Sequence, residues 1–168
     1  MEQIRLAVLE DLEQIVNIYN ASIPSRIATG DLQQISVASR LKWFNERDNK
    51  HYPIWVIEDN NKIIGWISLQ HFYGRPAYKS TAEISLYIAE NYQGKGIGKK
   101  LLKYVIEESP KLGLTNLLGF IFAHNQPSLS LFKKYDFQQW GYLPKVAKLD
   151  NIERDLIIMG LSLNWTNN

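Results

Sequence analysis

The stretch Tyr92-Gln93-Gly94-Lys95-Gly96-Ile97-Gly98-Lys99-Lys100 decides how the rest of the chain is interpreted. Its three glycines alternate with other residues between a strand-like segment and a helical pattern. A turn from a strand into a helix presents unpaired backbone N–H groups at the positive end of the helix dipole, which favours an anion. Glycines let the backbone curve closely around a phosphate. The segment therefore predicts a phosphate-binding turn.

Two other phosphate-binding motifs do not fit this spacing. The dinucleotide fingerprint needs its third glycine at the position of Lys99, and the P-loop needs Gly-Lys-Ser/Thr five residues after its first glycine. A turn that only ends a strand and begins a helix remains the alternative. Glycines cost backbone entropy, roughly 0.5–1 kcal/mol each inside a helix, and a purely structural turn seldom needs three of them.

Segments on both sides of this turn predict a mixed sheet with helices on both faces. Strand patterns occupy residues 3–8, 52–58, 62–72, 80–89, 114–123, 138–149 and 153–163. Helical patterns begin near Asp11, Ser36, the glycine-rich turn and Asn125, and loops are predicted at 20–34 and 73–79. This order predicts an α/β (α+β) fold with about seven strands.

Composition limits the class of protein. A length of 168 residues predicts a single domain over residues 1–168. The chain has no cysteine, which excludes disulfide scaffolds, thiolate zinc sites and cysteine nucleophiles. A net charge of +2 does not favour nucleic acid, and no apolar run approaches the ~18 residues of a membrane span. The acidic N-terminal stretch does not fit a signal peptide, so we expect a cytoplasmic protein without a nucleic-acid or membrane partner.

The residues around the turn resemble the GNAT N-acetyltransferases. The pattern Gln-x-x-Gly-x-Gly at Gln93, Gly96 and Gly98 follows a strand that ends Tyr87-Ile88-Ala89. The stretches 81–88, 124–129 and 131–137 are similar to the phosphinothricin acetyltransferase branch, and the predicted element order also matches. The resemblance implies the GNAT fold, in which acetyl-CoA lies between two splayed parallel strands.

The resemblance also implies which residues bind acetyl-CoA. Backbone groups of the fourth predicted strand would bond the pantetheine arm, and the glycine-rich turn would hold the pyrophosphate. Further contacts would come from the start and the end of the last helix. The implied residues are Leu86, Tyr87, Ile88, Gln93, Gly94, Lys95, Gly96, Ile97, Gly98, Lys99, Asn125 and Lys134.

Acetyl transfer to an amine requires a neutral amine, and only about one alkylamine molecule in a thousand is neutral at pH 7. A general base therefore increases the rate. Glu83 matches the acidic residue to which this branch assigns that role, and partial desolvation on a buried strand would raise its pKa. An exposed strand residue or half of an ion pair is the alternative. Many GNAT enzymes have a tyrosine acid where this chain has Phe132, so we expect the thiolate to leave unassisted and take a proton from water.

The acceptor is expected where the two predicted loops and the C-terminal hairpin meet. The resemblance implies a small-molecule primary amine, for which phosphinothricin, methionine sulfoximine and methionine sulfone are candidates. Polar loop residues suited to such a ligand are Arg26, Thr29, Arg75, Tyr78 and Lys79. The three histidines are too scattered for a metal site, and none is expected.

The resemblance implies a homodimer. Two other functions remain open: a protein N-terminal or lysine acetyltransferase, and a non-catalytic acyl-CoA-binding module that regulates a partner.

Overall fold

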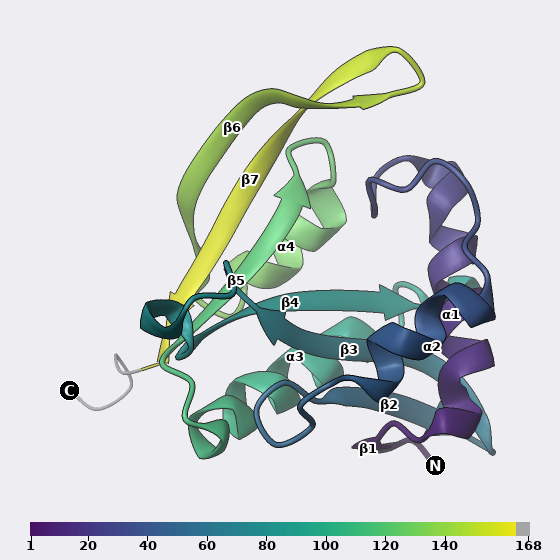
Figure 1. Cartoon of the computed structure of the whole chain (residues 1–168). Helices are drawn as coiled ribbons and strands as arrows, with labels where there is room; N and C mark the ends of the chain where they lie inside the picture. Colours follow the sequence, from purple (N-terminus) through teal and green to yellow (C-terminus); the bar gives the residue numbers. More distant parts are fainter. Residues whose placement is uncertain (164–168) are drawn as a thin grey trace.

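Seven strands form one mixed sheet in the order β1-β2-β3-β4-β5-β7-β6 (Figure 1). The structure is a computed structural model that describes residues 1–163. Every neighbouring pair of strands is antiparallel except β4 and β5, which are parallel. The strands are β1 (Gln3–Leu6), β2 (Ile54–Asp59), β3 (Lys62–His71), β4 (Thr81–Ile88), β5 (Asn116–Phe122), β6 (Gln138–Leu149) and β7 (Ile152–Ser162). The predicted fold class is confirmed.

Helices cover both faces of this sheet. They are α1 (Leu12–Ser22), α2 (Val37–Asn45), α3 (Ile97–Glu108) and α4 (Gln126–Lys133). Helix α1 contacts β3 and β4 on one face and carries α2 beside it, while α3 contacts the same strands on the other face (Figure 1). Ser36 caps α2 as predicted, because its hydroxyl accepts a hydrogen bond from the Ser39 amide at 3.1 Å. No helix within residues 1–163 is long and apolar enough to cross a membrane.

The parallel pair β4–β5 separates halfway along its length. Residues 81–84 of β4 pair with residues 116–119 of β5, but residues 85–88 pair only with β3. Residues 120–122 of β5 pair only with β7. The second half of β4 therefore has no partner strand on its β5 side, as the resemblance implied.

Two apolar cores lie on the two faces of the sheet. Alternate residues of a strand point to opposite faces. On β4, Ala82 and Ile84 belong to the core beneath α3, whereas Tyr87 packs on the core beneath α1. Glu83 and Ser85 share the face of Tyr87, so β4 directs its polar residues toward the α1–α2 side.

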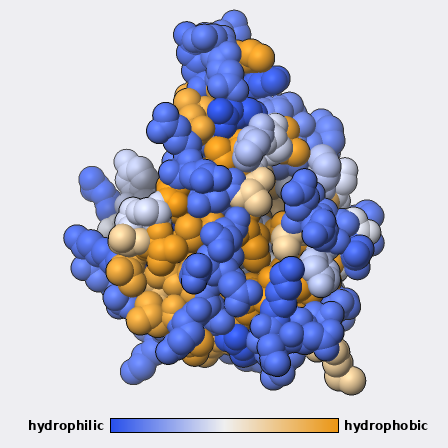
Figure 2. Space-filling view, turned by 90° about the vertical axis from the view of Figure 1, so that its right-hand side faces the viewer, coloured by the Kyte–Doolittle hydropathy of each residue, from blue (hydrophilic) through white to orange (hydrophobic). Residues whose placement is uncertain are grey.

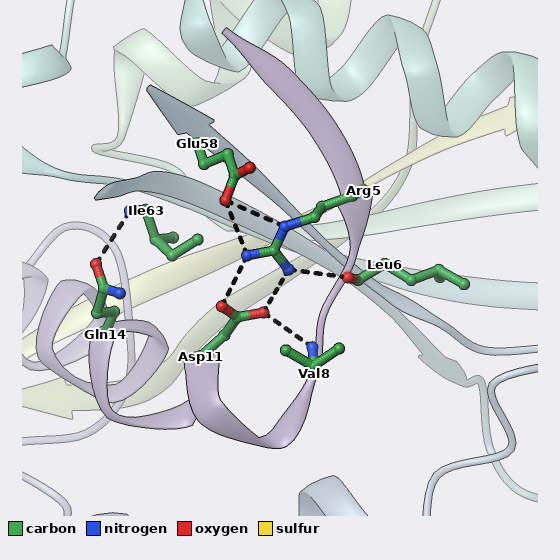
Figure 3. A network of polar contacts seen from close by, with 7 residues as sticks. All are labelled: Arg5, Leu6, Val8, Asp11, Gln14, Glu58 and Ile63. Carbon is green, nitrogen blue, oxygen red and sulfur yellow. Dashed lines mark hydrogen bonds and ion pairs between the residues drawn. The ribbon is translucent and has the colours of Figure 1, made fainter. Parts of the chain in front are cut away.

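A polar network fixes the N-terminal strand to the first helix (Figure 3). Arg5 donates hydrogen bonds to Asp11 at 2.7 and 2.9 Å and to Glu58 on β2 at 2.9 and 3.1 Å. Burial raises the pKa of the Asp11 carboxyl, but the bonds from Arg5 and from the Val8 amide outweigh burial and leave that pKa below its usual value. The network thus holds α1 in a fixed position against the sheet.

The element boundaries differ from the predictions by a few residues. The second strand begins at Ile54 rather than Tyr52, since Pro53 has no N–H to donate to a ladder. The segment 20–34 is not all loop: α1 continues to Ser22, and a 3-10 turn follows over Ile23–Ser25. Arg26 then adopts a left-handed φ of 57°, which ends the helical path.

Candidate active site

The glycine-rich turn has the open backbone that a bound anion requires. Gly94 and Gly96 have φ angles of +72° and +84°, a region that favours glycine. Apart from its own chain neighbours, a Cβ atom at either position would meet no atom of residues 1–163 within 4 Å. The turn therefore presents free space directly before α3, whose N-terminus favours negative charge.

A cleft of about 380 Å³ extends from this turn along the separated half of β4 to α4; we call it the turn cleft. It contains eleven of the twelve residues predicted to bind acetyl-CoA: Leu86, Tyr87, Ile88, Gln93, Gly94, Gly96, Ile97, Gly98, Lys99, Asn125 and Lys134. Lys95 is the exception, because its ammonium group lies over the Tyr92 ring, 5.2 Å from its centre, and lines none of the three cavities described here. The predicted residues thus lie together, while their individual roles stay predictions.

The side chain of Asn125 is already engaged in contacts within the protein. Its amide oxygen accepts a hydrogen bond from the Ser128 amide at 3.2 Å and caps α4, and its nitrogen donates to the Ile27 carbonyl at 3.0 Å. Ile27 and Ser128 also line the turn cleft. These contacts favour a positioning role for Asn125, which holds the loop after α1 against the cleft.

Glu83 lines a second cavity, of about 230 Å³, between the diverging strands; we call it the Glu83 cavity. This cavity shares Leu86 and Tyr87 with the turn cleft, so the two are adjacent. Burial raises the pKa of the Glu83 carboxyl, and a hydrogen bond from Gln70 lowers it in part. The result is a pKa above the usual glutamate value, which is the direction that favours a general base.

Neither Phe132 nor Tyr135 supplies a proton donor to the three cavities described here. Phe132 is buried against Gly119, where an added Cβ would lie 2.6 Å from the Phe132 ring. The Tyr135 hydroxyl donates to the Lys99 carbonyl at 3.1 Å and lines none of the three cavities. The structure therefore adds no side-chain acid at these two positions.

The first predicted loop brings one acceptor residue into the Glu83 cavity. Thr29 lines this cavity and is hydrogen-bonded to Tyr19 at 2.6 Å. Arg26 instead reaches away to the tip of the β6–β7 hairpin, where its Nε donates to Asp150 at 2.7 Å. Arg26 thus ties the loop to the hairpin and does not line any of the three cavities.

The second predicted loop does not line a cavity in this structure. Arg75, Tyr78 and Lys79 are exposed, and none lines the turn cleft or either cavity. Tyr78 packs edge-on against Phe72, and the Lys79 carbonyl accepts from Tyr52. Their part in acceptor binding stays a prediction.

Sequence reasoning missed a third cavity, of about 220 Å³, between α1, α2 and the sheet; we call it the α1–α2 cavity. It adjoins the Glu83 cavity through Ser85 and Tyr87. Its residues include Tyr19, Arg40, Trp43, Trp66, Ser68 and Gln70. The one sequence signal that could have indicated this cavity is the presence of polar residues, Ser68, Gln70 and Ser85, on one face of otherwise apolar strands.

These features define a class of protein that binds an extended, phosphate-bearing ligand across a splayed sheet and places a partly buried carboxylate beside it. A model of the Acetyltransferase (GNAT) family matches residues 12–137. The chain belongs to this family, and the predicted family is confirmed.

Comparisons with individual proteins agree over nearly the full length. The chain is 44% identical over 96% of its length to YwnH of Bacillus subtilis (99% of that protein), named a candidate phosphinothricin acetyltransferase. It is 30% identical over 97% of its length to an L-methionine sulfoximine/L-methionine sulfone acetyltransferase of Pseudomonas paraeruginosa (95% of that protein). A crystal structure of a GNAT superfamily phosphinothricin acetyltransferase from Sinorhizobium meliloti in complex with acetyl-CoA superposes with a TM-score of 0.90, at 27% identity over 96% of this chain and 88% of that one.

Proposed function

We propose that this GNAT protein is an N-acetyltransferase that moves an acetyl group from acetyl-CoA to the primary amine of a small amino-acid analogue. Phosphinothricin, methionine sulfoximine and methionine sulfone are the candidate acceptors, since relatives are named for them. The observation that carries the proposal is the position of Glu83, whose cavity adjoins the turn cleft through Leu86 and Tyr87.

The chain's own groups suit acetyl-CoA. Open backbone at Gly94 and Gly96 fits a pyrophosphate, and the unpaired side of β4 after Ile84 fits an extended amide-bearing arm. Acetyl-CoA supplies an acetyl group activated as a thioester. Residues Gln93 to Lys99 would hold its phosphates, and the backbone of 86–88 would orient its arm.

Glu83 accepts the proton that the acceptor's ammonium group must lose before its nitrogen can attack. Attack by the neutral amine forms the C–N bond, the C–S bond breaks, and the thiolate leaves with the electron pair. The nitrogen of the new amide gives its second proton to water, and water in turn gives one to the thiolate, since Phe132 cannot donate a proton; a thiol pKa near 8.5 makes the thiolate a fair leaving group. The net products are an amide, a thiol and the proton taken by Glu83.

The test is to follow thiol release from acetyl-CoA with the three candidate amines for the parent and Glu83→Gln. We expect kcat/KM to fall roughly 10²- to 10⁴-fold in Glu83→Gln, as for loss of a general base, with the Kd for CoA unchanged. Glu90→Gln is the matched control, because Glu90 is exposed after β4 and lines none of the three cavities. CoA binding without transfer to any amine would instead indicate a regulatory module, and transfer to peptides alone a protein acetyltransferase.

We further propose a homodimer formed through the β6–β7 hairpin. Strand β6 is an edge of the sheet, and the hairpin exposes Trp140, Tyr142, Leu143, Val146 and Ile152. Exposed apolar side chains grouped on one element favour association with another chain. A cytoplasmic location and a single domain over 1–168 stay predictions from the sequence.

A further inference from the structure

The α1–α2 cavity has a polar floor and aromatic walls. Ser68, Gln70 and Ser85 of β3 and β4 form its floor, and Trp43, Trp66 and Tyr87 are among its wall residues. Its volume of about 220 Å³ is below the roughly 300–1,000 Å³ of sites for drug-sized ligands. The cavity therefore suits a ligand of amino-acid size.

The strand register connects this cavity to the proposed base. Gln70 lies opposite Glu83, whose pKa its side chain lowers, and Ser68 lies opposite Ser85. Gln70 and Ser85 line the α1–α2 cavity, and Ser85 lines the Glu83 cavity as well. An acceptor whose amine lies at Glu83 can therefore extend over Ser85 and Ser68 toward α2.

Arg40 of α2 lines this cavity with a guanidinium group that has free donors. The group packs 5.5 Å from the centre of the Tyr19 ring and 5.6 Å from that of Trp43. Its one ion pair within the described residues is with Asp31 at 3.9 Å, and it donates no hydrogen bond there. The Asp31 carboxylate also accepts a hydrogen bond from the Tyr19 hydroxyl. Arginine held by ring stacking with open donors is suited to bind an oxyanion in two-point geometry.

Arg47 also packs on Trp43, but its guanidinium group is used for contacts within the protein. Its guanidinium lies 5.0 Å from the centre of the Trp43 ring. Unlike Arg40, it donates hydrogen bonds to the carbonyls of Tyr52 and Leu69. Arg47 thus anchors α2, whereas the free donors of Arg40 remain available to a ligand.

Ser68 supplies a second unused polar group. Its side chain is buried, with a relative exposure of 1%, and its hydroxyl has no hydrogen-bond partner among residues 1–163. A buried polar group without a partner costs free energy, so such groups are rare in native structures. A ligand atom in the cavity would remove this cost.

We propose that the α1–α2 cavity binds the acceptor, an amine that also carries an oxyanion, with Arg40 paired to the oxyanion and Ser68 hydrogen-bonded to another polar atom of the acceptor. The inference rests on the proposed function in that the amine lies at Glu83. The aromatic walls pack on the carbon chain between the two ends, which limits the acceptor to a small acidic amine.

The test compares Arg40→Gln with the parent on acids and on their neutral counterparts. The probes are methionine sulfone, its carboxamide, phosphinothricin and its α-carboxamide, which keeps the phosphinate. We expect Arg40→Gln to lower kcat/KM for the acids about 10- to 100-fold, and at most twofold for methionine sulfone carboxamide. A loss that persists with the phosphinothricin carboxamide assigns the phosphinate to Arg40, and a loss that disappears assigns the carboxylate. Lys42→Gln is the control, since it removes an exposed charge from α2 outside the three cavities.

Two outcomes would overturn the inference and leave the proposed function intact. One is an equal loss on methionine sulfone and its carboxamide, and the other is no loss on any of the acids. Calorimetric binding of the same acids to the CoA-loaded protein gives a readout without turnover. Acids that bind the parent and Arg40→Gln equally, or that bind neither, also overturn it. Transfer to no amine while acids still bind through Arg40 would count against the proposed function alone.

Ser68→Ala separates ligand binding from folding. Because the hydroxyl has no partner in the free protein, we expect Tm to stay unchanged or to rise. The KM for methionine sulfone should rise about 2- to 10-fold, as for loss of one neutral hydrogen bond. A lower Tm with an unchanged KM would show that Ser68 is structural and would refute its assigned contact.

Discussion

The Glu83 carboxyl and the Gln70 amide face each other across β3 and β4, and they affect the same proton. Burial raises the pKa of Glu83, and the bond from Gln70 stabilises the charged form. A general base acts only when deprotonated. The rate should therefore increase as pH rises through the pKa of Glu83, with a midpoint above the usual glutamate value.

Gln70→Leu tests this coupling at the scale of one residue. Removal of the bond that lowers the pKa should move the acidic limb of the kcat/KM–pH profile to higher pH. A contact between Gln70 and the acceptor would in addition lower the plateau at alkaline pH, and a limb that does not move would contradict the coupling. The measurement is a pH profile from pH 5 to 9, and Glu83→Gln should lose the limb altogether.

At the scale of elements, the turn before α3 combines positive φ angles at glycine with open space beside the backbone. Gly96 has a φ of +84° and lines the turn cleft, and Gly113 has a φ of +79° after α3 and lies outside the cavities. Neither would meet another atom within 4 Å if it gained a Cβ. The two glycines therefore have the same backbone conformation, but only Gly96 lines the turn cleft.

Gly96→Ala and Gly113→Ala should each lower stability by about 1–2 kcal/mol, because an L-residue disfavours this conformation. Only Gly96→Ala should also weaken CoA binding, since its added methyl group would occupy space in the turn cleft proposed for the pyrophosphate. Urea unfolding measures the first effect and isothermal titration calorimetry the second. Equal CoA affinities in the two variants would contradict a phosphate site at this turn.

At the scale of the whole molecule, the β6–β7 hairpin projects beyond the layered body. Figure 2 views the side that carries α1 and α2 and shows apolar surface between polar side chains, with the hairpin at the top. Val146 lies in a bulge where β6 and β7 do not pair, and its side chain is 55% exposed. A charge there leaves the strand ladder intact and changes only the surface.

Val146→Glu should therefore convert the proposed dimer to a monomer of 19.5 kDa. Sedimentation equilibrium or light scattering measures the mass, and circular dichroism should remain unchanged. Leu9→Glu is the matched control, because Leu9 is exposed at 47% on a different element. A parent protein that is monomeric at micromolar concentration would refute the homodimer.

Sequence patterns predicted the elements and the position of the turn because these depend on neighbours in the chain. Period-two alternation marked β1, a near-continuous apolar run marked β5, and three close glycines marked the start of α3. The predicted ends of strands were less accurate where a single residue prevents pairing, as Pro53 does before β2. Arg26 was predicted to face the acceptor, yet it pairs with Asp150, more than a hundred residues away in the chain.

What the sequence determined by itself is the order of strands and helices, the glycine-rich turn before α3 and the presence of a carboxylate on β4. Only the tertiary structure decided that Gln70 faces Glu83, that α2 places Arg40 over the cavity of Ser68, and that β4 separates from β5 after Ile84. Local patterns report the conformation of a segment. Register and cavities arise from contacts between segments far apart in the chain, and no local pattern encodes which residues will meet.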